Sequence, residues 1–374
     1  MKKIIQTLAS TGIQFFLRSY SALDKLLRVE STPEIYTAAG ATLIDLAKQF
    51  SDLDYPGYRN ADARIALGGA VVRVLCIDRI RELEPAPFAQ QNLFYDVSGG
   101  KFLDPYGHYK SVRGDTLVFH DPESLESYPG WRIVSEAAVL AGRYGYEVVK
   151  ELLGSLETRD LDWRPLSADD QRELLQNIVT GRQAERGLDL LMKTGFVEKH
   201  WPELNELNRI EQNKEFHPEG NVWAHTLAAL SYRKTLDLDL SLGLLFHDIG
   251  KPEAPKAEGK QFLRHAQIGG RTAERFLRRL DFPEKTASRV RFLVENHMLP
   301  AGLGTLPVYK TEEAMSSPLF PLVLELNRCD VSAGFHGLDD YYAACKAYRR
   351  FLKNKKNPFR DTAGKKFLKM YVGN

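Results

Sequence analysis

Histidine and aspartate residues recur in apolar, helix-like segments in the second half of this 374-residue chain. His247 and Asp248 stand side by side in LLFHDIGKP, where Gly250 and Pro252 are expected to end an apolar helix. Burying imidazole and carboxylate groups costs several kcal/mol unless they pair or bind a metal. Further residues of these types lie in similar segments: His225 in NVWAHTLAAL, His265 in FLRHAQIGG, His297 in FLVENHMLP and Asp330 in LELNRCDVSA. Each alone is typical of a structural hydrogen bond or a helix cap, but the set predicts a metal site.

The chemistry of such a site follows from its donor atoms. Imidazole nitrogens combined with carboxylate oxygens favour Mn, Fe, Co, Ni or Zn over Mg alone. A metal with open positions lowers the pKa of bound water and polarises a phosphoryl oxygen, so hydrolysis of a phosphate ester becomes feasible. Lys251 can bring a positive charge to a phosphate, although a solvated lysine that a helix dipole favours is an equally good interpretation.

The elements that must position these residues are helices, and they follow an N-terminal part of the chain that contains both strands and helices. Residues 63–80 predict two strands that turn at Gly68 and Gly69, and residues 92–107 predict a hairpin that turns at 98–100. After Pro122 helical periodicity prevails, and Ser167 is the expected N-cap of one helix. We predict a mixed fold: an α+β part over 1–120, all-α parts over 121–200 and 201–345, and a tail over 346–374.

The amino-acid composition limits the classes of protein to which the chain can belong. The net charge of +2, 43% hydrophobic residues and 27% charged residues are ordinary for a soluble globular protein. The tail from residue 346 carries ten Lys or Arg against one acid, Asp361, which is typical of an RNA-binding segment or of a solvated terminus. The chain has three cysteines, Cys76, Cys329 and Cys345, and no CxxC pair, so a disulfide framework is not expected. The opening MKKIIQTLASTGIQFFLRSY predicts an amphipathic helix and not a signal peptide. We expect a cytoplasmic protein without membrane association.

The order His225, His247-Asp248, Asp330 resembles the HD superfamily of metal-dependent phosphohydrolases. The resemblance implies a helical bundle in which these four residues hold one metal. His265 and His297 match the additional histidines of members that hold a second metal, with Asp248 as the bridging ligand and a catalytic residue. Lys251 would then be a catalytic residue that contacts the phosphate.

A further resemblance covers residues from about 34 to 345. PELNELNRIEQNKEFHPEGNVWAHTL, residues 202–227, is similar to the segment that joins neck and HD domain in tRNA nucleotidyltransferases, the CCA-adding enzymes. FYDVSGGKFLDPYG, residues 94–107, is similar to the family's link between head and neck. The resemblance implies a nucleotidyltransferase-like head over 1–120, a helical neck over 121–200, an HD domain over 201–345, and RNA, above all tRNA, or a nucleotide as partner.

In this family the head binds a triphosphate at a glycine turn and holds Mg²⁺ with three carboxylates. The positions that match are Gly40 for the turn, Asp52, Asp54 and Asp78 for the carboxylates, and Arg132 and Arg172 for nucleotide-binding arginines. Leu43 and Ile44 stand where the family has an arginine, and the uncharged PFAQQ of residues 87–91 replaces Arg-Arg-Asp. These departures predict a degenerate head.

Three functions follow as hypotheses. The first is an HD phosphohydrolase on a CCA-enzyme-like scaffold, acting on a phosphomonoester, a 2′,3′-cyclic phosphate or a nucleotide, including one at an RNA 3′ end. The first alternative is an active tRNA nucleotidyltransferase that adds nucleotides to tRNA 3′ ends. The second alternative is a non-catalytic RNA-binding protein.

Overall fold

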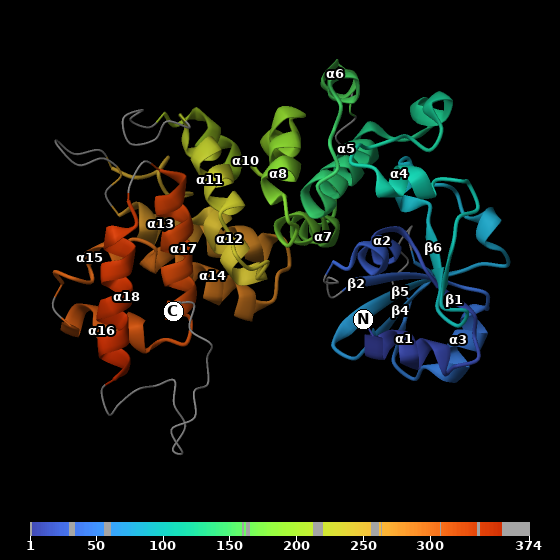
Figure 1. Cartoon of the computed structure of the whole chain (residues 1–374), viewed down its shortest axis with the longest axis horizontal. Helices are drawn as coiled ribbons and strands as arrows, with labels where there is room; N and C mark the ends of the chain where they lie inside the picture. The colour runs from blue at the N-terminus through green and yellow to red at the C-terminus, as the bar shows by residue number, and fades with distance from the viewer. Residues whose placement is uncertain are drawn as a thin grey trace. The chain divides into compact units, whose positions relative to one another are not determined.

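The computed structural model describes residues 2–29, 34–55, 61–158, 161, 165–211, 220–255, 262, 264–306, 308–334 and 337–353. The chain divides into two compact units, one of Met1–Ala141 with Gly145–Asp162 and the other of Gly142–Tyr144 with Trp163–Asn374 (Figure 1). The boundaries predicted near residues 120, 200 and 345 remain predictions. Three residues of the family-like string, Gln212, His217 and Glu219, and the basic tail beyond residue 353 lie outside the described residues.

The N-terminal unit contains a seven-stranded sheet in the order β3-β4-β5-β2-β1-β6-β7. The two predicted hairpins are present: β4 and β5 pair antiparallel, as do β6 and β7. Gly68 and Gly69 both have positive φ, which a tight turn between twisted strands requires. The strands are β1 Phe15–Leu17, β2 Glu34–Ala39, β3 Leu53–Asp54, β4 Ala63–Leu67, β5 Ala70–Cys76, β6 Phe94–Asp96 and β7 Lys101–Leu103.

Helices accompany this sheet. The first of them is amphipathic, as predicted, since Ile4 and Leu8 are buried and pack in one core with Phe15, Leu17 and Val72. The helices of the unit are α1 Lys2–Ala9, α2 Ser19–Leu27, α3 Leu43–Gln49, α4 Tyr109–Arg113, α5 Gly130–Val139 and α6 Lys150–Thr158. Short 3₁₀ turns cover Ile80–Glu82, Ala89–Gln91 and Pro122–Ser127. A π-helical turn covers Leu140–Tyr144, of which Gly142–Tyr144 belong to the other unit.

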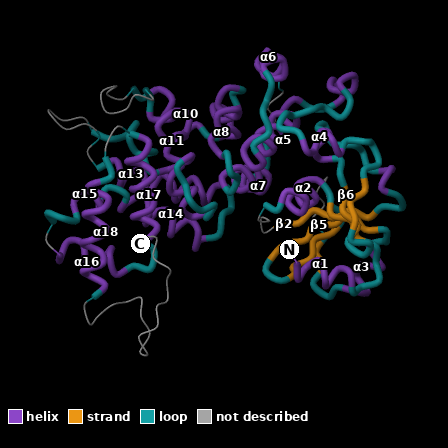
Figure 2. Tube along the Cα trace, in the orientation of Figure 1, coloured by secondary structure: helices purple, strands orange, loops and turns teal. Residues whose placement is uncertain are grey.

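The C-terminal unit is helical over its described residues, whereas the named strands all lie in the N-terminal unit (Figure 2). Ser167 accepts a hydrogen bond from the Asp170 N–H, as expected of an N-cap. The predicted mixed architecture, with a sheet-containing N-terminal part and a helical C-terminal part, is confirmed. Its helices are α7 Ala168–Val179, α8 Ala184–Lys193, α9 Phe196–His200, α10 Pro202–Asn205, α11 Val222–Ser231, α12 Leu238–Phe246, α13 His265–Arg279, α14 Glu284–Asn296, α15 Leu299–Gly302, α16 Val308–Ser316, α17 Phe320–Ala333 and α18 Asp339–Leu352, with a 3₁₀ turn at Glu206–Arg209.

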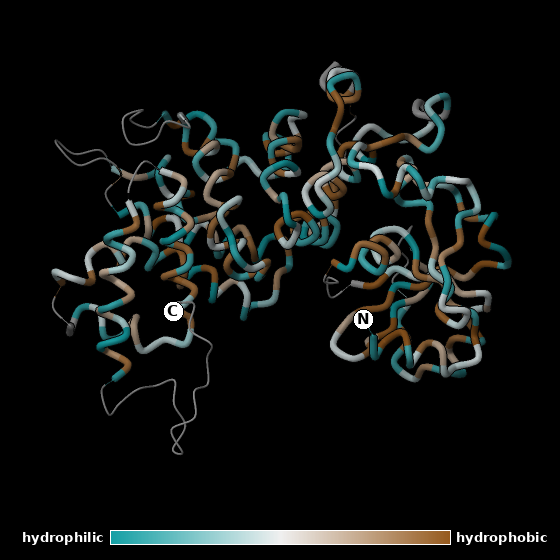
Figure 3. Tube along the Cα trace, viewed as in Figure 1, coloured by the Kyte–Doolittle hydropathy of each residue, from teal (hydrophilic) through white to brown (hydrophobic). Residues whose placement is uncertain are grey.

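Helix α12 lies at the centre of this unit. Every residue from Leu240 to Phe246 is buried, and the helix packs against α11, α14 and α17. Hydrophobic and hydrophilic segments alternate along the surrounding helices (Figure 3), as expected where one face of each packs on a buried partner. His247 and Asp248 therefore follow directly from a helix that is fixed on several sides.

No described helix combines the length and the apolar character that a membrane crossing would need.

Trp201 provides a test of the C-terminal core. Its side chain is fully buried, packs edge-on against Phe196 and Phe276, and donates a hydrogen bond of 3.0 Å from Nε1 to Gln171 Oε1. We expect Trp201→Ala to lower the free energy of unfolding by about 3–5 kcal/mol, because it leaves a large cavity. Urea denaturation of the full chain measures this. Met298→Ala, at a side chain that is 53% exposed, is the control and should change it by less than about 0.5 kcal/mol. Equal unfolding midpoints for both variants would contradict the conclusion that Trp201 is a central residue of this core.

Candidate metal centre

Several helices bring the six predicted metal ligands into two adjacent groups. His225, His247 and Asp330 form the first group, and Asp248, His265 and His297 form the second. Within each group the ligand atoms all lie within 4.8 Å of one another. The ligands come from separate elements: His225 from α11, His247 and Asp248 from the end of α12, His265 from the first position of α13, His297 from the end of α14 and Asp330 from α17.

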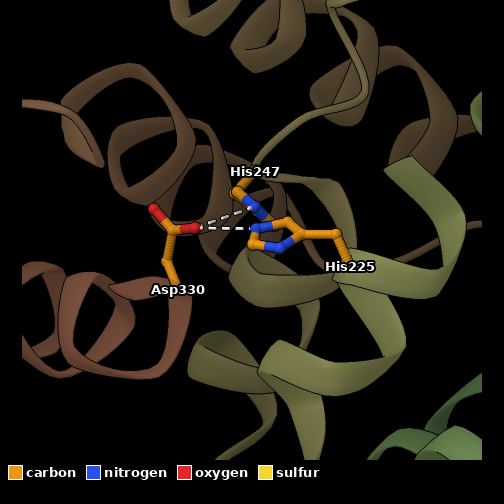
Figure 4. A group of neighbouring side chains, drawn as sticks. All are labelled: His225, His247 and Asp330. Carbon is orange, nitrogen blue, oxygen red and sulfur yellow. Dashed lines mark hydrogen bonds and ion pairs between the residues drawn. The ribbon is translucent and has the colours of Figure 1, made fainter. Parts of the chain in front are cut away.

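In the first group the three side chains point toward one another (Figure 4). His225 Nε2 lies 2.8 Å from Asp330 Oδ1, and His247 Nε2 lies 3.7 Å from the same oxygen. The other ring nitrogen of His247, Nδ1, lies 2.7 Å from the Leu244 carbonyl oxygen. Since a carbonyl only accepts hydrogen bonds, this contact assigns the proton to Nδ1 and directs the Nε2 lone pair at the carboxylates.

The second group repeats this arrangement. His265 Nδ1 lies 2.9 Å from the Phe262 carbonyl oxygen, and His297 Nδ1 lies 2.7 Å from the Val294 carbonyl oxygen. Their Nε2 atoms face each other at 3.2 Å. With both protons on Nδ1, two nitrogen lone pairs oppose each other at that distance, which is repulsive unless a cation lies between them. Histidines that bind a metal characteristically donate their other N–H in this way.

Asp248 connects the two groups. One carboxylate oxygen, Oδ2, lies 3.3 Å from His247 Nε2, and the other, Oδ1, lies 3.5 Å from His265 Nε2. Lys251 Nζ lies 2.6 Å from Oδ2 and 5.4 Å from the ring centre of Phe262. The lysine that the sequence assigned to a phosphate therefore pairs with the central carboxylate in this structure.

Burial and neighbouring charges set the protonation of the centre. Burial opposes ionisation of Asp248, but the charges of Lys251 and His247 outweigh it and hold the pKa of this carboxyl well below its usual range. Asp330 likewise has a lowered pKa, since its contacts with His225 and His247 exceed the effect of burial. Both carboxylates are therefore ionised at neutral pH.

The imidazoles of the second group stay neutral. Burial lowers the pKa of His297 to about 4, and the charge of His247 adds to this effect. Burial also lowers the pKa of His265. His247 differs: burial disfavours its charged form, but Asp248 and Asp330 outweigh burial and raise its pKa. Neutral imidazole and ionised carboxylate are the forms that bind metals.

The donor set fits a divalent transition metal. His225, His247 and His297 are each 1% exposed and Asp248 is 3% exposed. His247 Nε2 is buried, and its contacts with Asp248 at 3.3 Å and Asp330 at 3.7 Å lack the geometry of a good hydrogen bond. A cation bound by the mixed nitrogen and oxygen donors would satisfy this atom and separate the opposed lone pairs.

Gly250 has a role different from the helix-ending one that the sequence predicted. Its backbone is not in the left-handed region that a glycine at a helix end usually adopts. A Cβ at this position would lie 2.1 Å from the His265 carbonyl oxygen and 2.5 Å from the Gly269 nitrogen. The glycine is therefore required because the segment after His247 and Asp248 packs directly on the start of α13.

In the N-terminal unit the predicted carboxylates are divided between two places. Gly40 follows β2 and Asp78 follows β5, and both line a cavity of about 550 Å³. Asp52 and Asp54 lie at β3, on the edge of the sheet, where Asp54 pairs with Arg64 at 2.7 Å. Strand β4 separates β3 from β5, which places these two strands about 10 Å apart. Among the described residues these three carboxylates do not form a group of metal ligands.

The two predicted nucleotide-binding arginines have intramolecular partners. Arg132 donates to Glu136 at 2.9 Å and lies 3.6 Å from Glu84. Arg172 pairs with Asp169 and donates to the Asp281 carbonyl oxygen.

The sequence analysis missed a buried pair that ties two ligand-bearing helices together. Arg328 and Glu325 form two hydrogen bonds of 2.8 and 2.6 Å, and Arg328 also donates to the Tyr232 carbonyl oxygen at the end of α11. This contact joins α17, which carries Asp330, to α11, which carries His225. The i, i+3 spacing of the pair in LELNRCD was the available signal.

Comparisons with known proteins find relatives in sequence and solved structures of similar fold. No family model matches the chain. The multifunctional CCA protein of Acinetobacter baylyi is 24% identical over 255 residues, which cover 67% of this chain and 59% of that protein. The CC-adding tRNA nucleotidyltransferase of Thermus thermophilus is 34% identical over 135 residues, or 34% of this chain and 31% of that protein. The chain thus spans less than two thirds of the length of these curated relatives.

Among solved structures, the Bacillus stearothermophilus CCA-adding enzyme in complex with CTP matches with a TM-score of 0.54 and 14% identity, covering 93% of this chain and 80% of that chain. At this identity the likeness concerns the fold alone. The chain is therefore similar in sequence to a multifunctional CCA protein and, over about a third of its length, to a CC-adding tRNA nucleotidyltransferase, and it has the fold of a CCA-adding enzyme.

Proposed function

We propose that the C-terminal unit is an HD-type, divalent-metal-dependent phosphohydrolase whose substrate is a phosphomonoester, a 2′,3′-cyclic phosphate or a nucleotide. The observation that carries this proposal is the pair of buried ligand groups that share Asp248 between them. Four imidazoles and two carboxylates that converge in a helical core have little other use, because their burial is costly without a cation. Mn, Ni, Co, Fe and Zn suit this donor set.

Each residue of the candidate metal centre has a distinct role in the proposed reaction. When bound, the metal supplies an activated water and polarises the phosphoryl group. The three histidines that donate from Nδ1 to a carbonyl keep their rings oriented with Nε2 toward the centre. Asp248 faces both ligand groups, and Lys251, at 2.6 Å from it, holds the carboxylate in its ionised form. In the proposed reaction the same ammonium group would contact a negatively charged phosphate, so we assign it a catalytic role beside Asp248.

We propose tRNA nucleotidyl transfer as the second candidate function, with Mg²⁺ at the N-terminal unit and tRNA as the partner. The named relatives support this function better than they support hydrolysis. The cavity that contains Gly40 and Asp78 offers space for a nucleotide. The distance of Asp52 and Asp54 from that cavity, together with the missing arginine at Leu43 and Ile44, supports the view that this head is degenerate.

Hydrolysis is tested with Mn²⁺, Ni²⁺ or Co²⁺ on bis-p-nitrophenyl phosphate and 2′,3′-cAMP. We expect metal-dependent turnover that falls at least about 100-fold in Asp248→Ala, because the variant removes the carboxylate between the two groups. Elemental analysis of the same samples should show less bound metal in the variant. Asp340→Ala, on the exposed first turn of α18, is the matched control and should keep native activity. A native protein without turnover would refute the proposal.

Gly250 tests whether the packing at the end of α12 maintains the centre. We expect Gly250→Ala to reduce both metal content and hydrolysis, since the added Cβ would overlap the backbone of α13 and push His265 away from Asp248. The control is Gly304→Ala, an exposed position where a Cβ meets nothing within 4 Å. If Gly250→Ala bound metal as the native protein does, the close approach would have no part in forming the centre.

Nucleotidyl transfer is tested by incorporation of labelled CTP or ATP into tRNA that lacks its terminal CCA. We expect no incorporation, because the carboxylates at Asp52 and Asp54 lie apart from Asp78. Incorporation by the native protein that Asp52→Ala abolishes would instead establish the second candidate. If the protein neither hydrolyses nor transfers but still binds tRNA, a non-catalytic RNA-binding role is what remains.

A further inference from the structure

The ammonium group of Lys251 lies within the candidate metal centre, beside its second group of ligands. Its Nζ atom is 2.6 Å from Asp248 Oδ2, and its side chain is 11% exposed. The ring centre of Phe262 lies 5.4 Å from this Nζ, and the carbonyl oxygen of Phe262 lies 2.9 Å from His265 Nδ1. One residue therefore contacts both the ammonium group and a ligand of the second group.

Lys251 contacts one carboxylate oxygen of Asp248 and leaves the other one open. That second oxygen, Oδ1, lies 3.5 Å from His265 Nε2, and His265 Nε2 lies 3.2 Å from His297 Nε2. A cation could therefore bind Asp248 Oδ1 and the two imidazoles without displacing the lysine. Lys251 would act on such a cation through its charge and not by blocking the ligands.

The two ligand groups differ in net charge. In the first group Asp330 contributes −1, and among the described residues it pairs with His225 and His247 and with no lysine or arginine. In the second group Asp248 contributes −1, which the +1 of Lys251 cancels. Imidazole adds no charge in the neutral form that binds a metal. A divalent cation thus meets a negative charge at the first group and a neutral pair at the second.

Asp248 also borders the first group, since its Oδ2 lies 3.3 Å from His247 Nε2. This contact does not reverse the difference, because the carboxylate and the ammonium group beside it are neutral as a pair. Burial makes the difference matter: the side chain of Asp248 is 4% exposed, and charges a few ångströms apart interact more strongly where little water screens them. An ion at the first group would add its own positive charge and oppose a second ion further.

We propose that Lys251 makes the two metal positions unequal, so that the first group fills first and the second fills only at a metal concentration about tenfold higher or more. The inference deepens the proposed hydrolase function, on which it rests for the presence of a metal at these ligands. Lys251 is then also a positioning residue, because it sets through Asp248 how readily a second ion binds. At low metal concentration the centre would hold one ion, bound by the first group.

The inequality is tested by titrating the full chain with Mn²⁺ and measuring the free ion by electron paramagnetic resonance. The native protein should show two dissociation constants that differ by about tenfold or more. Lys251→Met removes the charge and keeps the length of the side chain, and a thioether is a poor ligand for Mn²⁺. This variant should bind the second ion about tenfold more tightly and bring the two constants together, because a net negative charge then remains at both groups.

Two further variants serve as controls. Lys251→Arg keeps the positive charge and should keep the native difference between the two constants. Lys285→Met removes an exposed lysine from the first turn of α14, about 18 Å along the helix from His297, and should change neither constant. If Lys251→Met failed to fold by circular dichroism, Lys251→Gln would provide the same comparison with a polar side chain.

Ligand variants identify which position fills first. His297→Ala should remove the weaker Mn²⁺ ion and leave the tighter one, whereas His225→Ala should weaken the tighter ion. Equal constants in the native protein, the reverse order in the ligand variants, or an unchanged second constant without the lysine charge would overturn this inference and leave the metal centre standing. A native protein that bound no Mn²⁺ would overturn both the inference and the metal centre on which it rests.

Discussion

The buried carboxylate of Asp248 is the constraint around which the C-terminal unit is organised. An ionised group that is 3% exposed needs compensating charge, and it obtains it from Lys251 three residues later and from imidazoles on two sides. These contacts require α12, α13 and α14 to meet within a few ångströms. The apolar core keeps them there: α12 is buried over its last two turns, and Gly250 permits the approach to α13.

Around this carboxylate, the orientation of the ligands comes from local backbone contacts. His247, His265 and His297 each direct Nδ1 to the carbonyl oxygen three residues earlier in the chain. Each ring is therefore fixed by its own segment, and each Nε2 points inward without help from distant side chains. Longer contacts act between helices instead, as Arg328 does when it joins the end of α11 to α17.

The sequence predicted much of this arrangement and missed specific parts of it. Helical periodicity, the Ser167 cap and the two hairpin turns are local signals, and local interactions decide them in the structure as well. The spacing of histidines and aspartates identified the six residues that converge, because their burial in apolar helices is costly whatever the fold. The role of Gly250 could not be predicted, since it depends on a neighbour that is distant in sequence. The place of Asp52 and Asp54 on an edge strand likewise depends on the order of the strands, which no short motif encodes.

The contact between His225 and Asp330 joins residues that lie 105 positions apart in the chain. A cation held by both side chains would stabilise the folded unit, because it binds the two ligands only when folding has brought them together. Release of the ion and opening of the helical unit would then be one event. The lifetime of the folded unit would then depend on how strongly His225 of α11 and Asp330 of α17 bind their common ion, as well as on the apolar core between these helices.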